Sequence, residues 1–261
     1  MRLRLKPFEV ELLGLEPNTH NKYRLSVKQY EKLLLFREGN AIFPGIGSRV
    51  LVVGDIHCPF DLDSYLDHCK KTYRDFNCDT VVFIGDILDN HFPSFHPTDP
   101  DGFGAGEELE RAIHRVQRWY NAFPEATVII GNHDKMASRK AFSGGVPKAW
   151  IKEYDEVLNT PNWDFVVQKF VDGVEYVHGE GGTARTRIKA EAHSIVQGHL
   201  HTQAYIDWLF SGSSRKFGMQ VGCGIDHDTY AFAYAKAGKK PAISCGVVLN
   251  GTQPFLIPME V

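Results

Sequence analysis

Five short stretches of the chain gather carboxylate, imidazole and amide side chains, which are groups that bind metal ions and transfer protons in enzymes. None of the five contains a cysteine, which excludes a soft, all-sulfur metal site, whereas manganese, iron, zinc or cobalt suits these ligands. The stretches are Gly54-Asp55-Ile56-His57, Gly85-Asp86-Ile87-Leu88-Asp89, Gly131-Asn132-His133-Asp134, Val177-His178-Gly179 and Gly198-His199-Leu200-His201.

The number of ligand candidates in these stretches favours two metal ions over one. Seven candidates are too many for a single tetrahedral zinc site. They suit two ions if one carboxylate bridges them. Two ions about 3.5–4 Å apart can clamp a phosphoryl oxygen and generate a nucleophile from water at neutral pH.

Each of the first three stretches directly follows a predicted strand. Short apolar runs predict strands at Arg49–Gly54, Thr80–Ile84 and Thr127–Ile130, and helical patterns follow at Leu62–Phe76, Glu107–Tyr120 and Pro147–Leu158. This alternating order predicts a parallel sheet covered by helices. The carboxyl ends of parallel strands line one crevice, so we expect the three stretches to meet there.

The second half of the chain predicts a mostly β layer that faces the first sheet. Its one predicted helix spans about residues 184–193. If the segment after the predicted strand Ser194–Gln197 is extended, His199 and His201 point the same way and can both be ligands. The predicted strands are Phe165–Val171, Val174–Val177, Ser194–Gln197, Ala204–Phe210, Lys216–Val221 and Ile243–Leu249.

Composition places the chain among ordinary globular proteins. It has 261 residues, of which 43% are hydrophobic and 23% charged, and a net charge of −3. Such a chain buries enough surface to fold without a stapling metal, so a metal site would serve chemistry. The five cysteines form no C-x-x-C pair, which predicts reduced thiols and a cytoplasmic protein. No signal peptide or membrane helix is expected.

Residues 1–45 differ from the rest and are predicted to be a lead-in to a domain of residues 46–261. Ser26 and Gln29 form a capping box that predicts one helix, packed on the main core. A small DNA-contacting appendage is the alternative, because this segment has a mild excess of basic residues. The aperiodic loop from Asn90 to Gly106 is expected to be functional or mobile.

The ordered motifs D-x-H, G-D-x-x-D, G-N-H-D, His-Gly and G-H-x-H resemble the calcineurin-like metallophosphoesterase superfamily over about Arg49 to His201. The resemblance implies a four-layer αββα sandwich, an α/β fold of two mixed β-sheets flanked by helices. The Asp89-Asn90-His91 run and the aromatic segment 92–96 look more like the small bacterial and phage-encoded members.

The resemblance also implies a role for each motif residue. Two divalent ions are expected, with manganese preferred and iron, zinc, cobalt or nickel as alternatives. A metal-bound hydroxide would attack phosphorus, while His133 protonates the leaving oxygen and Asp89 orients His133. The first ion would be held by Asp55, His57, Asp86 and His201, and the second by Asp86, Asn132, His178 and His199.

The substrate is less closely defined by the sequence. Asn90 stands where the protein phosphatase branch has an arginine, which disfavours a phosphoprotein substrate. Basic clusters at Lys135, Arg139 and Lys140 and at Arg185, Arg187 and Lys189 are either solvated faces or phosphate contacts, and neither interpretation is preferred. The candidate substrate-binding residues are Asn132, His91, His96 and Arg185.

We therefore predict a metal-dependent phosphoesterase that acts on phosphodiesters of nucleotides or nucleic acid, as a nuclease would. One alternative is a phosphomonoesterase for small phosphorylated metabolites. Another is a metal-bound scaffold of low activity whose N-terminal helix binds a partner. The sequence leaves the oligomeric state open.

Overall fold

The computed structural model describes residues 3–4, 15, 22–23, 47–93, 103–212, 214–229 and 240–260. The chain divides into two compact units, residues 1–47 and 48–261. In the first unit, β1 (Leu3–Arg4) pairs antiparallel with β2 (Lys22–Tyr23). The helix expected after Ser26, and with it the DNA-contacting alternative, lies outside the described residues.

The larger unit contains a six-stranded sheet in the order β13-β12-β3-β4-β5-β6. The neighbouring strands β3, β4, β5 and β6 are parallel to one another. Strand β12 is antiparallel to β3, and β13, at the edge, is antiparallel to β12. The strands are β3 (Arg49–Val53), β4 (Thr80–Phe83), β5 (Ala126–Ile129), β6 (Trp163–Val166), β12 (Ser244–Leu249) and β13 (Gln253–Pro258).

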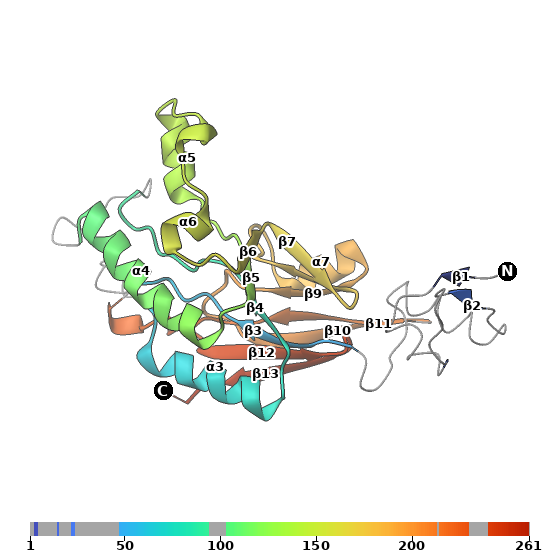
Figure 1. Cartoon of the computed structure of the whole chain (residues 1–261). Helices are drawn as coiled ribbons and strands as arrows, with labels where there is room; N and C mark the ends of the chain where they lie inside the picture. Colours follow the sequence, from blue (N-terminus) through green and yellow to red (C-terminus); the bar gives the residue numbers. More distant parts are fainter. Residues whose placement is uncertain are drawn as a thin grey trace. The chain divides into compact units, whose positions relative to one another are not determined.

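A second, five-stranded sheet has the order β10-β11-β9-β8-β7, with parallel pairs β8–β9 and β9–β11 (Figure 1). Its strands are β7 (Gln168–Val171), β8 (Val174–Val177), β9 (Ser194–Gln197), β10 (Tyr205–Ser211) and β11 (Ser214–Gln220). The helices are α3 (Asp63–Asp75), α4 (Ala105–Ala122), α5 (Met136–Ser143), the 3-10 turn η1 (Lys148–Trp150), α6 (Tyr154–Leu158) and α7 (Ala184–Glu191). The predicted α/β fold with two mixed sheets flanked by helices is confirmed.

Alternation along β3 shows how the layers pack, because successive side chains of a strand face opposite sides of a sheet. Leu51 and Val53 join the core that the first sheet forms with α3 and α4. Val50 and Val52 join a second core, which also contains Tyr176 of β8. The six-stranded sheet is therefore buried on both faces, as a parallel sheet usually is.

Two predicted elements are wrong in their boundaries. The strand predicted at 165–171 is two strands, β6 and β7, which belong to different sheets and are separated by the exposed Val167. The helix predicted at 147–158 is interrupted, because Ile151 is extended and Glu153 begins a new helix with its own capping box. Periodicity detects neither break, since both segments stay apolar at regular spacing.

Two elements were not predicted. Helix α5 is short and contains no buried residue, so it shows no apolar stripe. Strand β13 contains two prolines, which edge strands tolerate. The signal for β13 was the Asn250-Gly251 pair, whose positive φ angles of 52° and 65° form the hairpin with β12.

None of the helices in the described part of the chain combines the length and apolar character that crossing a bilayer requires.

The buried Trp119 of α4 ties this helix to the loop after β3. Its Nε1–H donates a hydrogen bond to Asp61 Oδ2 at 3.0 Å, and Asp61 Oδ1 accepts from Arg115 Nε at 2.6 Å. We expect Trp119→Phe to lower the free energy of unfolding by about 1–3 kcal/mol, because a buried carboxylate oxygen loses its donor. Urea unfolding followed by circular dichroism measures this change.

The matched control is Trp150→Phe, since Trp150 is 83% exposed. This control should change the free energy of unfolding by less than about 0.5 kcal/mol. Equal stability losses in the two variants would contradict the proposed role of Trp119.

Candidate metal centre

The loops that follow β3, β4 and β5 meet the loops that follow β8 and β9 at one site. Main-chain bonds align the first two loops, with His57 N donating to Asp86 O at 2.9 Å. The two sheets are joined by His199 N, which donates to Asp55 Oδ2 at 2.7 Å. The site therefore lies where the carboxyl ends of parallel strands from both sheets converge.

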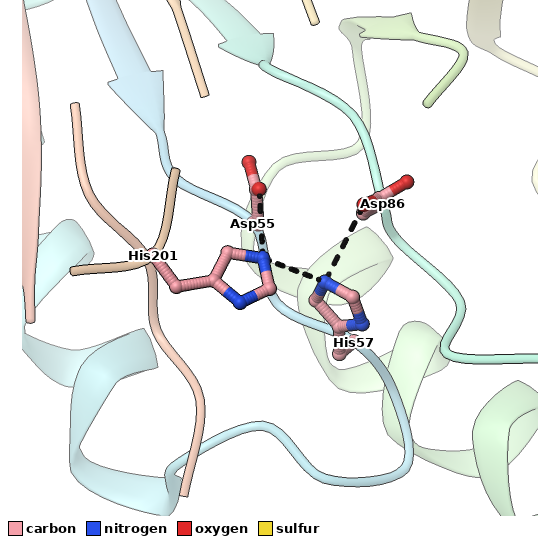
Figure 2. Close-up of side chains that lie close together, drawn as sticks. All are labelled: Asp55, His57, Asp86 and His201. Carbon is pink, nitrogen blue, oxygen red and sulfur yellow. Dashed lines mark hydrogen bonds and ion pairs between the residues drawn. The ribbon is translucent and has the colours of Figure 1, made fainter. Parts of the chain in front are cut away.

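Asp55, His57, Asp86 and His201 form the first group of side chains (Figure 2). The Nε2 atoms of His57 and His201 are 3.1 Å apart. His201 Nε2 lies 3.2 Å from Asp55 Oδ2, and His57 Nε2 lies 3.5 Å from Asp86 Oδ2. These ligand atoms lie within 4.8 Å of one another, close enough for one cation to contact them all.

A second group shares Asp86 with the first and adds His178 and His199. His178 Nε2 is 3.2 Å from Asp86 Oδ2 and 3.3 Å from His199 Nδ1. Asn132 also belongs here, because its Oδ1 is 2.9 Å from His178 Nε2. The structure thus brings all seven predicted ligands together and divides them into two adjacent groups that meet at Asp86.

The outer nitrogens of two histidines show which atoms face the centre. His57 Nδ1 is 2.8 Å from Asp89 Oδ1, and His178 Nδ1 is 3.1 Å from Ile84 O. In both pairs the oxygen can only accept, so Nδ1 carries a proton and Nε2 is the nitrogen that faces the centre. Imidazole nitrogens and carboxylate oxygens therefore converge on both groups, an arrangement that a cation stabilises.

Two buried oxygens support the same conclusion. Asp55 Oδ1 and Asp86 Oδ2 have no hydrogen-bond partner among the described residues, although both side chains are almost completely buried. A buried carboxylate oxygen that lacks a hydrogen-bond donor is costly unless a positive charge compensates it. The donor set of carboxylate, imidazole and amide groups fits borderline or hard divalent ions. The residues present therefore fit a divalent metal.

The pKa values of the candidate ligands are shifted by burial and by the charges of neighbouring ligands. Burial favours protonated Asp86, but the charges of His178 and His57 outweigh it and hold the pKa of Asp86 well below its usual range. Burial lowers the pKa of His178, yet attraction to Asp86 raises it to about 10. Burial, followed by His133 and His201, lowers the pKa of His57.

The backbone at the centre is strained, and glycines make room for the ligands. His57, Asp86 and His199 have positive φ angles of 48°, 47° and 69°, which non-glycine residues seldom adopt. A Cβ added at Gly131 would collide with the Asp86 carboxylate, and one at Gly198 would collide with that of Asp55. Strain of this kind concentrates at functional sites.

His133 and Asp89 lie beside the first group. His133 Nδ1 is 2.6 Å from the main-chain oxygen of Asp89 and 3.5 Å from its carboxylate. The carboxylate is closer to His57, so Asp89 orients a predicted metal ligand as well as the predicted acid. Burial disfavours protonated His133, but Asp86 and Asp89 raise the pKa of His133 above its ordinary value.

The other predicted substrate-binding residues do not join the two ligand groups in the described part of the chain. His91 is buried, and its main-chain N–H donates to Glu108 Oε1 at 2.7 Å, so it is not an exposed loop histidine. Arg185 pairs with Asp207 at 2.6 Å and stacks on Tyr205, so the structure does not bring it into either ligand group. His96 lies outside the described residues.

Two local features differ from the sequence analysis. Residues 198–203 form turns and are not extended, with Leu200 N donating to Gly198 O at 2.8 Å. His199 and His201 therefore reach different groups. Asp134 does more than cap its own turn: its two oxygens accept from Leu88 N at 3.0 Å and Gly131 N at 2.8 Å, which joins two ligand loops. Burial and then Asp86 raise the pKa of Asp134 to about 6.

Comparison with protein families identifies the class of this protein. The model of the family "Calcineurin-like phosphoesterase" matches residues 48–222. The chain therefore belongs to the calcineurin-like phosphoesterase family, whose members are metal-dependent hydrolases of phosphoesters. The two ligand groups described above fit the metal requirement of this family.

Solved structures with a similar fold share little sequence with this chain. A metallophosphoesterase from Sphaerobacter thermophilus is 12% identical, with 82% of this chain and 88% of that chain covered and a TM-score of 0.43. The Pseudomonas putida nuclease MPE is 12% identical (80% and 86% covered, TM-score 0.37). Vacuolar Protein Sorting 29 from Cryptosporidium parvum is 14% identical (82% and 98%, TM-score 0.38). Comparison with curated protein sequences found no significant match.

The tight packing at Gly198 predicts a metal-binding defect without loss of a ligand. A methyl group in Gly198→Ala would displace the Asp55 carboxylate, so metal affinity should fall about 10- to 100-fold, as for other changes that misplace ligands. Calorimetric titration with Mn²⁺ measures this, and circular dichroism checks the fold. Gly106→Ala is the control, because a Cβ there meets nothing within 4 Å. Unchanged manganese affinity in a folded Gly198→Ala protein would refute the expectation.

The raised pKa of His178 predicts that metal binding releases a proton. Because attraction to Asp86 and Asp55 outweighs burial and raises the pKa of His178 to about 10, a metal must displace a proton from His178 at pH 7–8. Apparent Mn²⁺ affinity should therefore rise as pH rises, by about tenfold per unit for one proton. Calorimetry in buffers of different ionisation enthalpy counts the protons released. An affinity that is flat between these pH values would contradict the prediction.

Proposed function

We propose that this chain is a dinuclear phosphodiesterase that acts on nucleotides or nucleic acid. The observation that carries the proposal is the position of Asp86 between the two ligand groups. Its buried Oδ2 faces His57 Nε2 at 3.5 Å and His178 Nε2 at 3.2 Å. A carboxylate shared in this way suits a bridge between two adjacent cations.

Each group would hold one ion, with Mn²⁺ the preferred metal for these oxygen and nitrogen donors. Bound divalent ions neutralise charge on the phosphoryl oxygens and activate a water nucleophile. The proposed ligands are Asp55, His57, Asp86 and His201 for one ion, and Asp86, Asn132, His178 and His199 for the other.

His133 is the proposed proton donor to the leaving oxygen. Its Nδ1 is held by the main-chain oxygen of Asp89 at 2.6 Å, which leaves Nε2 for the substrate. Asp86 and Asp89 raise the pKa of His133 against the effect of burial, which favours the protonated form that a general acid needs. Asp89 supports this role through its carboxylate, which also fixes the ring of His57.

Two features favour a diester of nucleotide type. Asn90 Nδ2 donates to His133 O at 2.9 Å, so the residue at the protein phosphatase arginine position ties a loop and offers no guanidinium. Lys135, Arg139 and Lys140 follow His133 in the sequence and can meet a phosphate backbone.

The five buried, free cysteines support a reducing compartment such as the cytoplasm.

Two variants test the proposed bridge and proton donor separately. Asp86→Asn should lose both ions and all hydrolysis, because it removes the shared ligand. His133→Asn should keep two metal equivalents but lose about 10²- to 10⁴-fold in kcat, as expected for loss of a general acid. Metal content by mass spectrometry and hydrolysis of bis-p-nitrophenyl phosphate are the measurements.

The substrate panel adds p-nitrophenyl phosphate, cyclic nucleotides and DNA, each with Mn²⁺ after chelation. Strict preference for p-nitrophenyl phosphate would contradict the proposed diesterase activity and support a phosphomonoesterase. A protein that binds two metals but hydrolyses none of these substrates would favour the scaffold. Full activity after chelation would refute the metal-dependent mechanism.

A further inference from the structure

Residues 135–158, called the arm below, project from the loop that holds His133. The arm contains α5, η1 and α6, and α5 stands out from the sheets (Figure 1). Both ends are attached to the candidate metal centre. Met136 N donates to His133 O at 3.0 Å, and Tyr154 Oη donates to Asp134 O at 3.2 Å. The base of the arm therefore adjoins the loop that carries the proposed proton donor.

The tip of the arm is held by its own main-chain hydrogen bonds. Gly144 N donates to Lys140 O at 3.1 Å, and Val146 N donates to Ala141 O at 2.9 Å. Ile151 N donates to Lys148 O at 2.9 Å after the turn. The tip thus has a defined backbone, which lowers the entropic cost of presenting its side chains to a ligand.

Three large apolar side chains are exposed on this defined tip. Trp150 is 83% exposed, Phe142 is 52% exposed and Val146 is 39% exposed. All three lie within nine residues of one another in the chain, and several exposed apolar side chains on one short segment indicate an interaction site more strongly than a single one does. Two of the three are aromatic, and aromatic side chains in nucleic-acid-binding proteins stack on unpaired bases.

The charge of the arm indicates what kind of ligand it would bind. The arm has five basic residues, all between positions 135 and 152, and three acidic residues, all between positions 153 and 156, whereas the whole chain has a net charge of −3. Glu180 pairs with Lys135 at 2.8 Å, and Glu153 pairs with Lys148 at 3.4 Å, which offsets part of this charge. The basic side chains between positions 135 and 152 are of the type that contacts a phosphodiester backbone.

A cavity of about 900 Å³ is lined by residues of the arm, of α4 and of β6, and by Leu88, Asn90 and Asp134 of the loops next to the candidate metal centre. Leu109 of α4, Phe142 and Tyr154 of the arm, and Trp163 of β6 contribute apolar lining. The polar side of the cavity contains Asn90, three lysines and five acidic residues, which are Lys135, Lys148, Lys152, Glu108, Asp134, Glu153, Asp155 and Asp164. The apolar part of this recess suits a planar base.

From these features we propose that the arm binds single-stranded nucleic acid, with Trp150 and Phe142 stacking on bases and the basic residues contacting phosphates. This inference rests on the proposed diesterase function and specifies its substrate class. A single strand is favoured over a duplex because only unpaired bases expose their faces for stacking. A bilayer or a second copy of the chain would use the apolar side chains but would leave the nearby phosphoesterase site unused.

Binding of a fluorescein-labelled, phosphorothioate-linked dT20 to the Mn²⁺-loaded protein tests the inference by fluorescence anisotropy. Trp150→Ala should weaken binding roughly 5- to 150-fold, the loss expected for one stacked base, and Trp150→Phe should restore part of it. Lys148→Ala combined with Lys152→Ala should reduce the slope of log affinity against log salt by about 1.4, if both lysines contact phosphates. Phe210→Ala is the matched control, because Phe210 is 72% exposed on β10, and it should leave binding unchanged.

Hydrolysis of bis-p-nitrophenyl phosphate separates failure of the arm from failure of the proposed function. The arm variants should keep this activity, since the small diester does not need the arm. A wild-type protein that hydrolyses the small diester but does not bind dT20 would overturn the arm inference alone. A protein that binds dT20 through Trp150 but hydrolyses no diester would support the arm and overturn the proposed function.

Two further outcomes would assign the arm to another ligand. Trp150-dependent binding to phosphatidylcholine–phosphatidylglycerol vesicles, with dT20 affinity unchanged in Trp150→Ala, would overturn the inference in favour of a bilayer. A Trp150-dependent dimer in sedimentation, again with unchanged dT20 affinity, would overturn it in favour of self-association.

Discussion

The convergence of carboxylate oxygens and imidazole nitrogens in a buried crevice is the constraint on which the rest of the structure depends. Asp86 stays ionised between His57 and His178, and its inward oxygen has no hydrogen-bond partner among the described residues. Only positive charge stabilises such an arrangement. The left-handed backbone at Asp86 and His199 costs free energy, which the surrounding sheets and loops must offset.

The two sheets have complementary tasks in holding this crevice. The parallel strands β3, β4 and β5 deliver the acidic and amide ligands, while β8 and β9 bring His178 and His199 from the opposite layer. The outer nitrogen of His178 rests on Ile84 O, which belongs to the first sheet. Ligand geometry is therefore coupled to the packing between layers, so a change such as Gly198→Ala acts on the metal through packing alone.

The two metal-ligand groups and the arm have different physical properties. The ligand groups are buried, polar and tightly packed, and they suit chemistry shared across the calcineurin-like phosphoesterase family. The arm leaves Trp150 exposed and carries basic residues, so it suits contact with a ligand larger than one phosphate. The arm begins where the loop of His133 ends, so the proposed recognition segment and the proposed proton donor are parts of one continuous stretch of chain.

Short-range patterns determined much of this protein. Apolar runs followed by Gly-Asp or Gly-Asn marked β3, β4 and β5 and the side chains at their ends, because strand and turn preferences are local. Tertiary structure alone decided that the chain changes sheets at Val167 and that residues 198–203 turn so that His199 and His201 serve different groups. It also placed Asp134 across two loops and buried His91. These outcomes depend on contacts between segments far apart along the chain, and no local periodicity records such contacts.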